Sequence, residues 1–300
     1  MNRRPQIALL ADGRRLHLQD GPIDLIVEAS GHEAGVRSAY EAAARRFTGL
    51  LDELCAELTE LRKAADPAWT ALRGTVARRM HAAVAPFAAD CFITPMAAVA
   101  GSVAEEILGA MLAAAPLDRV YVNNGGDIAL HLSGCERFTI GAMDRPDAQG
   151  VMCTMTVDAE DPVRGIATSG RHGRSFSLGI ADAVTVLAQT ASQADAAATV
   201  IANAVDLPDH PAVLRIPANE LQVDSDLADR PVTRDVGTLT EREIEEALDA
   251  GSCRARHLLA AGLIEGAALR LLGETVVVGA KGIVAPHGLH KVRLHHAVHA

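Results

Sequence analysis

The chain has 300 residues, of which 49% are hydrophobic and 22% charged, a composition typical of one large globular domain or two small ones. Its formal net charge of -10 argues against nucleic acid as a partner, because binding phosphates requires clustered Lys and Arg. Charge, Gly or Pro interrupts the apolar stretches before the roughly 20 residues that a membrane-spanning helix needs, and Ile7–Leu10 is too short for a signal-peptide core. We therefore expect a cytoplasmic protein with no membrane partner.

The cysteines and aromatic residues limit the kinds of metal, disulfide and ligand sites that we expect. The five cysteines lie far apart with no C-x-x-C pair, so we expect buried, reduced thiols and neither a zinc site nor a disulfide framework. Aromatic residues make up only 3% of the chain. A flat heterocyclic ligand is therefore expected to contact mainly backbone and aliphatic side chains.

The first half of the chain predicts hairpins followed by helices. Residues 6–29 alternate apolar runs with Asp12-Gly13 and Asp20-Gly21, dipeptides that favour tight turns between antiparallel strands. Ala34–Leu61 has helical spacing, with leucines recurring at three- and four-residue intervals. Met96–Ala114 predicts a second helix of small apolar residues, and the strand Val120–Val122 leads into a turn at Asn124–Asp127.

The second half predicts several strands and then helices, which is the pattern of an α+β fold. We predict a loop at Asp224–Thr238, a helical region over Glu241–Leu272 interrupted near Gly251 and Gly262, and one domain over residues 1–286 with a loose His-rich tail at 287–300. The predicted strands are Ile128–Leu132, Phe138–Ile140, Met152–Val157, Ile166–Thr168, Ala183–Leu187 and Val276–Val278, and a further helix covers Ser192–Val205.

Asp195 and Thr199 form a candidate metal site. They are four residues apart, so on a helix they project from one face and offer two hard oxygen ligands, which suits Mg²⁺ with waters or phosphate in its other positions. An Asp and a Thr one turn apart are more often helix-start or surface residues. The terminal His287, His290, His295, His296 and His299 offer only opportunistic metal binding in a mobile tail.

Two polar turns are candidate cofactor-binding segments. In Asn124-Gly125-Gly126-Asp127 the two glycines allow positive φ and close approach of the backbone to a ligand, although a plain hairpin turn with Asp127 as its cap is an equal alternative. The second segment, Ser169-Gly170-Arg171-His172-Gly173-Arg174-Ser175, is rich in hydrogen-bond donors that suit an anion. The alternative to an anion-binding site is a solvated polar turn. His172 is the candidate catalytic acid or base, if it is more than an exposed loop histidine.

Three blocks of the sequence resemble the ApbE-type flavin transferases, which attach FMN from FAD to a Thr or Ser of a target protein. They are the small-residue helix start Ala98–Ala104, the segment Val122–Ile128, similar to V-N-x-G-G-D, and the block Val184–Thr199, similar to the metal-binding block of the family. The resemblance implies an ApbE-like, T-fold-related α+β fold with antiparallel sheets flanked by helices. It also implies a cation, Mg²⁺, held by Asp195, Thr199 and a backbone carbonyl of Ala98 or Ala100.

The sequence departs from these transferases at two places. Met96–Gly101 lacks the Lys of G-x-A-K-G, and the H-x-x-D-P-x-x-G stretch, which helps to hold FAD in the family, is missing between Ser175 and Ala183. The chain is more similar to an uncharacterised cytoplasmic branch of the ApbE-like proteins, associated with microbes that use tetrahydromethanopterin. That similarity covers Phe92–Ala104, Asn123–Leu130, Gly165–Ala204 and Val232–Gly273.

Three functions are compatible with these patterns. The first is a Mg²⁺-dependent enzyme or accessory protein that binds a phosphorylated heteroaromatic cofactor, pterin-like before flavin-like. The second is a non-catalytic ligand-binding or scaffold protein, and the third is a divergent flavin transferase. We also expect a homo-oligomer, with a homodimer as the default, because the helices predicted at Met96–Ala114 and Leu258–Leu272 are apolar over much of their surface.

Overall fold

The computed structural model describes residues 5–142, 153–279, 283–284 and 292–295. The chain divides into two compact units, which are described separately. Both contain helices and mainly antiparallel strands, so the predicted α+β class is confirmed. The single domain predicted over residues 1–286 stays a prediction. Unit 1 comprises Met1–Arg137, Asp158–Ala167 and Gln189–Ala196, and unit 2 comprises Phe138–Val157, Thr168–Ala188 and Ala197–Ala300.

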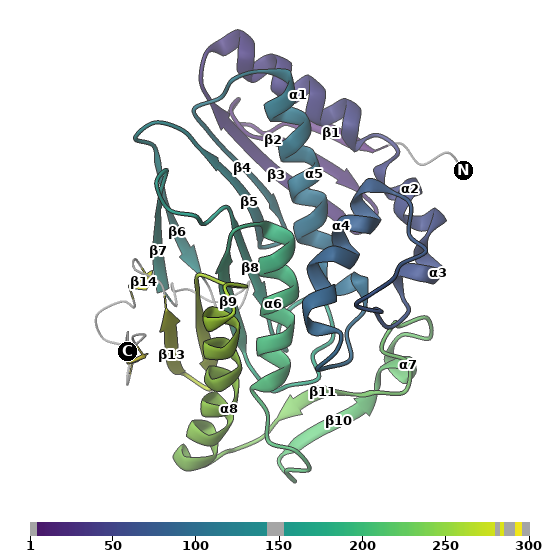
Figure 1. Cartoon of the computed structure of the whole chain (residues 1–300), viewed down its shortest axis with the longest axis vertical. Coiled ribbons are helices and arrows are strands. Elements are labelled where there is room, and N and C mark those ends of the chain that lie inside the picture. Colours follow the sequence, from purple (N-terminus) through teal and green to yellow (C-terminus); the bar gives the residue numbers. More distant parts are fainter. Residues whose placement is uncertain (1–4, 143–152, 280–282, 285–291, 296–300) are drawn as a thin grey trace. The chain divides into compact units, whose positions relative to one another are not determined.

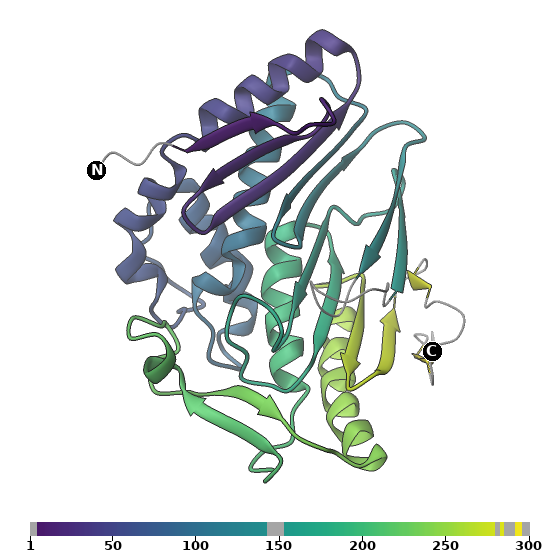
Figure 2. The same cartoon turned by 180° about the vertical axis from the view of Figure 1, so that it is seen from behind.

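The sheet of unit 1 has the strand order β1-β2-β3-β4-β5, with every neighbouring pair antiparallel, and the start of β8 pairs with β5. Leu25 and Val27 of β3 are fully buried and alternate with half-buried residues, because successive side chains of a strand point to opposite faces. Figures 1 and 2 show α1 and α5 covering one face of this sheet. The bounds are β1 (Gln6–Leu9), β2 (Leu16–Asp20), β3 (Ile23–Ser30), β4 (Arg119–Asn124), β5 (Asp127–Leu132), β8 (Gly165–Ser169), α1 (Glu33–Phe47) and α5 (Val99–Ala114).

The helix predicted over residues 34–61 is broken into three. Gly49 has a φ of 87°, a left-handed conformation that ends the helical path after α1. Phe47, Leu50, Leu54 and Leu61 are nevertheless buried, as the periodicity predicts. The other helices of this region are α2 (Leu50–Ala56), α3 (Leu58–Leu61), α4 (Thr75–Val84) and the 3₁₀ helices η1 (Ala85–Phe87) and η2 (Pro95–Ala98).

Helix α5 is the most apolar helix of unit 1. Together with η2 it forms, among the described residues, one helical stretch long and apolar enough to cross a membrane, Pro95–Ala114. It packs against α1, α4, β4 and β5, and Val103, Ile107 and Met111 are fully buried. These contacts are those of a core helix in a globular unit.

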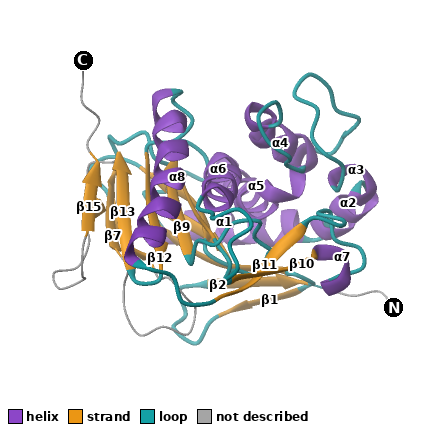
Figure 3. Cartoon of the chain, turned by 90° about the horizontal axis from the view of Figure 1, so that it is seen from below, coloured by secondary structure: helices purple, strands orange, loops and turns teal. Residues whose placement is uncertain are grey.

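The main sheet of unit 2 has the strand order β9-β12-β13-β15, in which β15 is parallel to β13 and the other pairs are antiparallel. Helix α8 packs over β12 and β13 (Figure 3) and begins with a capping box in which Thr240 and Glu243 bond to each other's backbone amides. The bounds are β9 (Ala183–Ala188), β12 (Gly266–Leu271), β13 (Glu274–Gly279), β15 (Val292–His295) and α8 (Glu241–Ala260).

The remaining elements are two small sheets and two helices. A two-stranded sheet pairs β10 with β11, and a three-stranded sheet has the order β14-β7-β6. Helix α6 begins in a segment of unit 1. The bounds are β6 (Arg137–Ala142), β7 (Cys153–Asp158), β10 (Val213–Pro217), β11 (Pro231–Val236), β14 (Ile283–Val284), α6 (Ala191–Ala204) and α7 (Ala218–Leu221).

Two predictions in the last third of the chain are wrong. The expected loop at Asp224–Thr238 contains β11, which begins at Pro231, a position where the missing N–H of proline costs little. The expected helix over Leu258–Leu272 is the end of α8 followed by β12, because Gly262, with a φ of 67°, ends the helix and β12 is buried between two strands. Leu258–Leu272 therefore no longer supports a homodimer.

Candidate functional site

Asp195 lies at the start of α5, although it belongs to α6. Its Oδ2 accepts a hydrogen bond from the amide of Gly101 at 2.9 Å, and the amide of Ala100 also donates to this carboxylate. These are first-turn amides of α5, whose own N-cap residue, Ala98, has no side chain to cap them. The carboxylate of Asp195 therefore supplies the missing N-cap of α5.

Gly101 allows this approach of the two helices. A Cβ added at Gly101 would lie 2.3 Å from the carbonyl oxygen of Ala191 and 2.9 Å from the amide nitrogen of Ser192. Both atoms are backbone atoms in the first turn of α6, so they have no side-chain freedom with which to move aside. Only glycine fits at this contact, which sets how closely α5 and α6 approach.

The turn between β4 and β5 adds polar groups next to this helix start. The side-chain Nδ2 of Asn124 donates to the carbonyl oxygen of Ala100 at 3.2 Å, and Asn124 is only 4% exposed. Gly125 and Gly126 both have positive φ, as the sequence predicts, and the amide of Gly126 donates to the side chain of Asn123 at 2.8 Å. The backbone of α5 and this turn are thus joined through Asn124.

Asp127 places a second carboxylate near Asp195. Burial raises the pKa of Asp195 well above its ordinary value of 3.8, and the negative charge of Asp127 raises it further, against the opposing effect of the Gly101 and Ala100 amides. The two carboxyl groups therefore disfavour each other's ionised form. A proton or a cation between them relieves that repulsion.

The donor set fits a hard divalent cation better than a zinc site. Among the described residues there is no cluster of three or more His, Cys, Asp and Glu side chains that could hold a metal ion. Mg²⁺ does not need such a cluster, because it commonly uses one or two carboxylates together with water and ligand phosphates. Asp195, Asp127 and the backbone carbonyl of Ala100 offer oxygen atoms of the kind that Mg²⁺ binds.

The other two predicted metal ligands have different surroundings. Ala98 is completely buried at the end of η2, directly before α5. Thr199 is half-buried on α6, one turn after Asp195. Their metal-binding roles stay predictions, as do the roles of the histidines in the tail, whose side chains lie outside the described residues.

The predicted anion-binding turn of unit 2 is organised by a residue that the sequence did not single out, Asp182. Arg171 donates to Asp182 Oδ1 through Nε at 2.9 Å and through Nη2 at 2.6 Å, and His172 Nε2 lies 3.3 Å from the same oxygen. Oδ2 of Asp182 accepts from the amide of Leu272 at 2.5 Å. Arg171 is therefore occupied in an internal ion pair.

The other residues of this turn differ in their contacts and in their exposure to solvent. Gly170 lies against the backbone of Asp182, where an added Cβ would be 2.4 Å from the Asp182 carbonyl oxygen. Ser169 is half-buried, and Ser175 is exposed. His172 keeps part of its surface exposed and can present Nδ1 to a ligand when Nε2 faces Asp182. The turn is thus a fixed structure with His172 and Ser175 on its accessible side.

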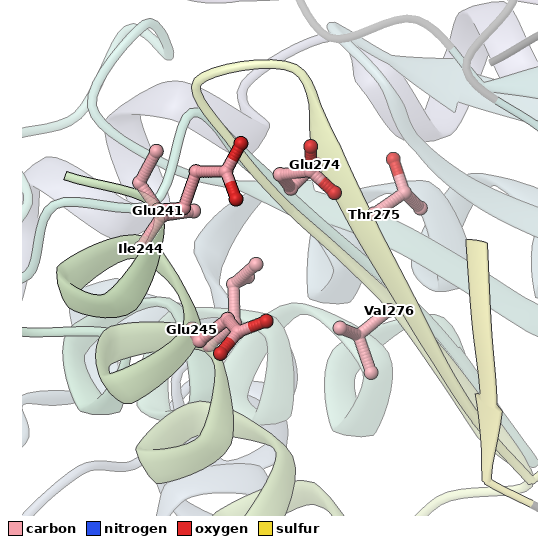
Figure 4. Close-up of a pocket in the computed structure, with 7 residues that line it drawn as sticks. Glu241, Ile244, Glu245, Glu274, Thr275 and Val276 are labelled. Carbon is pink, nitrogen blue, oxygen red and sulfur yellow. The ribbon is translucent and has the colours of Figure 1, made fainter. Parts of the chain in front are cut away.

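Unit 2 also contains a small pocket of about 30 Å³ between α8 and β13 (Figure 4). Glu241, Glu245 and Glu274 line it together with the apolar Ile244, Leu248 and Val276. This volume is far below the several hundred Å³ that a heteroaromatic cofactor needs. The pocket contains none of the predicted site residues.

Sequence reasoning missed Asp182 because a single Asp before a strand carries no motif. Its one signal is position, since it directly precedes the buried strand Ala183–Ala188 and follows the donor-rich turn. The sequence indicates Asp127 only as a cofactor-binding or turn-capping residue. Its proximity to Asp195 depends on the pairing of β4 with β5 and on the placement of α6, which the sequence does not specify.

The fold and the carboxylate pair define an α+β protein with a candidate cation site at the start of α5. The chain belongs to the family described as AbpE bacteria, whose model matches residues 7–277. The predicted membership of the ApbE-like family is therefore confirmed.

Two of the relatives are UPF0280 proteins of methanogens. A UPF0280 protein of Methanopyrus kandleri is 38% identical over 128 residues, covering 43% of this chain and 48% of the relative. A UPF0280 protein of Methanosphaerula palustris is 40% identical over 132 residues, covering 44% and 53%. The chain thus spans about half the length of these relatives. The apo form of the Pseudomonas stutzeri flavinyl transferase ApbE matches with a TM-score of 0.39 and 13% identity, covering 69% of this chain and 87% of that structure.

Proposed function

We propose that this chain binds a divalent cation, Mg²⁺, at Asp195 and Asp127, and with it a phosphorylated heteroaromatic cofactor that is pterin-like or flavin-like. The observation that carries the proposal is the pair of carboxylates at the start of α5, where burial and Asp127 raise the pKa of Asp195. A cation that neutralises both groups removes the cost of keeping them ionised together.

Phosphate is the natural partner of such a cation. Two carboxylates leave most of the six positions around Mg²⁺ for water or for phosphate oxygens, so the ion bridges protein and ligand. The amides of Ala100 and Gly101 donate to Asp195 and are therefore not the groups that receive the phosphate. The phosphate is held through the metal in this proposal, which couples the affinities of the two ligands.

The remaining predicted residues complete the proposal. Thr199 and the backbone carbonyl of Ala98 add ligands to the cation, and the turn Asn124–Asp127 approaches the cofactor through its two glycines. In unit 2, Ser169, Gly170, Arg171 and Ser175 shape the anion-binding turn, with Arg171 acting through Asp182, and His172 is the acid or base if a reaction takes place. A cytoplasmic homo-oligomer acting in tetrahydromethanopterin-linked one-carbon metabolism is the setting that we propose.

Two other functions have specific support. The capping of α5 by Asp195 is a purely structural use of this carboxylate and favours a non-catalytic scaffold. Membership of the family favours a divergent FAD:protein FMN transferase. A scaffold requires only affinity for a ligand or partner, whereas the transferase must cleave FAD and leave FMN on a protein.

Calorimetric titration with Mg²⁺ tests the proposal. The titration is done alone and in the presence of FMN, FAD and a phosphorylated pterin, on the wild type and on Asp195→Ala. We expect the wild type to bind Mg²⁺ and one of these compounds cooperatively, and the variant to bind both more weakly. If the wild type binds no divalent cation under any of these conditions, the cation site does not exist and the scaffold function is favoured.

A further inference from the structure

Helices α5 and α6 cap each other. Asp195 of α6 accepts from the amide of Gly101 in the first turn of α5, at 2.9 Å. In the opposite direction, Glu105 of α5 accepts from the amide of Ser192 in the first turn of α6, with Oε1 2.6 Å from that nitrogen. Each helix therefore supplies the carboxylate that the other helix lacks at its start.

The carboxylate of Glu105 is itself fixed. Its Oε2 lies 3.2 Å from Nε of Arg79, which comes from α4, and its side chain is only 19% exposed. Nη1 of Arg79 donates to the carbonyl oxygen of Ser102 at 3.0 Å and to Oε2 of Glu106 at 2.9 Å. Arg79 is thus held at three points on α5, so one oxygen of Glu105 is kept facing Ser192.

Two contacts with α5 hold the first turn of α6 in place, in addition to the hydrogen bond from the amide of Gln193 to the side chain of Thr190. The backbone contact between Gly101 and Ala191 limits how closely α6 approaches α5, because even a methyl group does not fit between them. The hydrogen bond from Ser192 to Glu105 prevents the first turn of α6 from moving away. Ser192 and Asp195 belong to the same helical turn, so a shift of one moves the other.

We propose that Glu105 is the positioning residue for Asp195, setting the place of its carboxylate relative to the Gly101 amide and to Asp127. The inference rests on the proposed cation site, because its consequence is measured as cation affinity. Glu105 contacts neither the cation nor the cofactor in this account. It acts by holding the first turn of α6 through Ser192.

Glu106 provides a matched control, because it is adjacent on α5 and binds the same Arg79. Its carboxylate accepts from Arg46 Nε at 2.7 Å and from Arg79 at 2.9 Å, and these two partners belong to α1 and α4. Glu105→Ala and Glu106→Ala therefore remove the same charge from one network of ion pairs. Only the first removes the partner of Ser192.

The experiment measures Mn²⁺ affinity by electron paramagnetic resonance, with unfolding midpoints recorded for each variant. We expect Glu105→Ala to weaken Mn²⁺ binding about tenfold, the size of one lost charge-assisted hydrogen bond, and Glu106→Ala to leave it within about twofold. Glu105→Gln should recover much of the affinity, because its amide oxygen still accepts from Ser192. It also keeps the test valid if the alanine variant does not fold.

The outcomes separate this inference from the proposed function. If the wild type binds Mn²⁺ and the two alanine variants lose affinity equally, or neither loses it, Glu105 does not position Asp195 while the cation site stands. Failure of Glu105→Gln to bind better than Glu105→Ala also contradicts the inference. If the wild type itself binds no Mn²⁺, both the inference and the proposed function are overturned.

Discussion

Gly101→Ala is the substitution that most directly perturbs the contact between α5 and α6. The new Cβ would lie 2.3 Å from the carbonyl oxygen and 2.5 Å from the carbonyl carbon of Ala191, about 1 Å inside ordinary van der Waals contact. Both are backbone atoms of the first turn of α6. Relief therefore requires α6 to move away from α5, and Asp195 moves with it.

The size of the effect follows from two opposing contributions. Replacing glycine by alanine inside a helix is ordinarily favourable by about 1 kcal/mol. Forcing a methyl group into a filled space costs up to about 3 kcal/mol, and the upper end applies here because rigid backbone is displaced. We therefore expect Gly101→Ala to lower the free energy of unfolding by about 2 kcal/mol.

Gly109→Ala is the control, because it lies in the same helix and its added Cβ would meet nothing within 4 Å. It should raise the free energy of unfolding by about 0.5–1 kcal/mol. Urea denaturation of the three proteins, followed by circular dichroism, measures both changes. If Gly101→Ala and Gly109→Ala shift the free energy of unfolding in the same direction and by the same amount, the close contact between α5 and α6 is not present in solution.

Four further predictions concern the two groups of site residues. Asp195→Ala should weaken Mg²⁺ and phosphorylated-cofactor binding together, by about 1–3 kcal/mol in calorimetry, and unchanged Mg²⁺ affinity contradicts its role. Because the folded pKa of Asp195 exceeds 3.8, the metal-free chain should lose stability as pH rises from 3.8 through that raised pKa. A denaturation series in which Asp195→Asn shows the same loss argues against this. Asp182→Asn should cost about 3 kcal/mol of unfolding free energy, since Arg171 loses its buried partner, and a neutral effect in urea denaturation opposes the ion pair. The purified chain should not transfer FMN to a target peptide with FAD and Mg²⁺, and a flavinylated peptide in mass spectrometry shows the contrary.

Local patterns predicted the elements that build unit 1. The Asp20-Gly21 turn, the small apolar residues of α5 and the Gly125-Gly126 turn each determine a short stretch of backbone, and the structure has all three. Family membership was likewise predictable, because ordered motifs along the chain carry it. These features depend on residues close together in the sequence.

The wrong predictions concern segments whose secondary structure depends on tertiary contacts. Gly251 was expected to interrupt a helix, but it lies inside α8, where a Cβ would collide with the side chain of Val205 at 2.3 Å. Gly266–Leu271 shows no alternation because both faces of β12 are buried, so a strand and a helix look alike there. The links from Asp195 to Gly101 and from Glu105 to Ser192 join residues about 90 positions apart, and no local pattern indicates them.

Anomalous X-ray diffraction from crystals soaked in Mn²⁺ can detect a cation at the start of α5. We predict one strong anomalous peak within coordination distance of carboxylate oxygens of both Asp195 and Asp127, which disappears in crystals of Asp195→Ala. A fully soaked crystal with no peak between these two carboxylates, or with a peak that persists in Asp195→Ala, would contradict it.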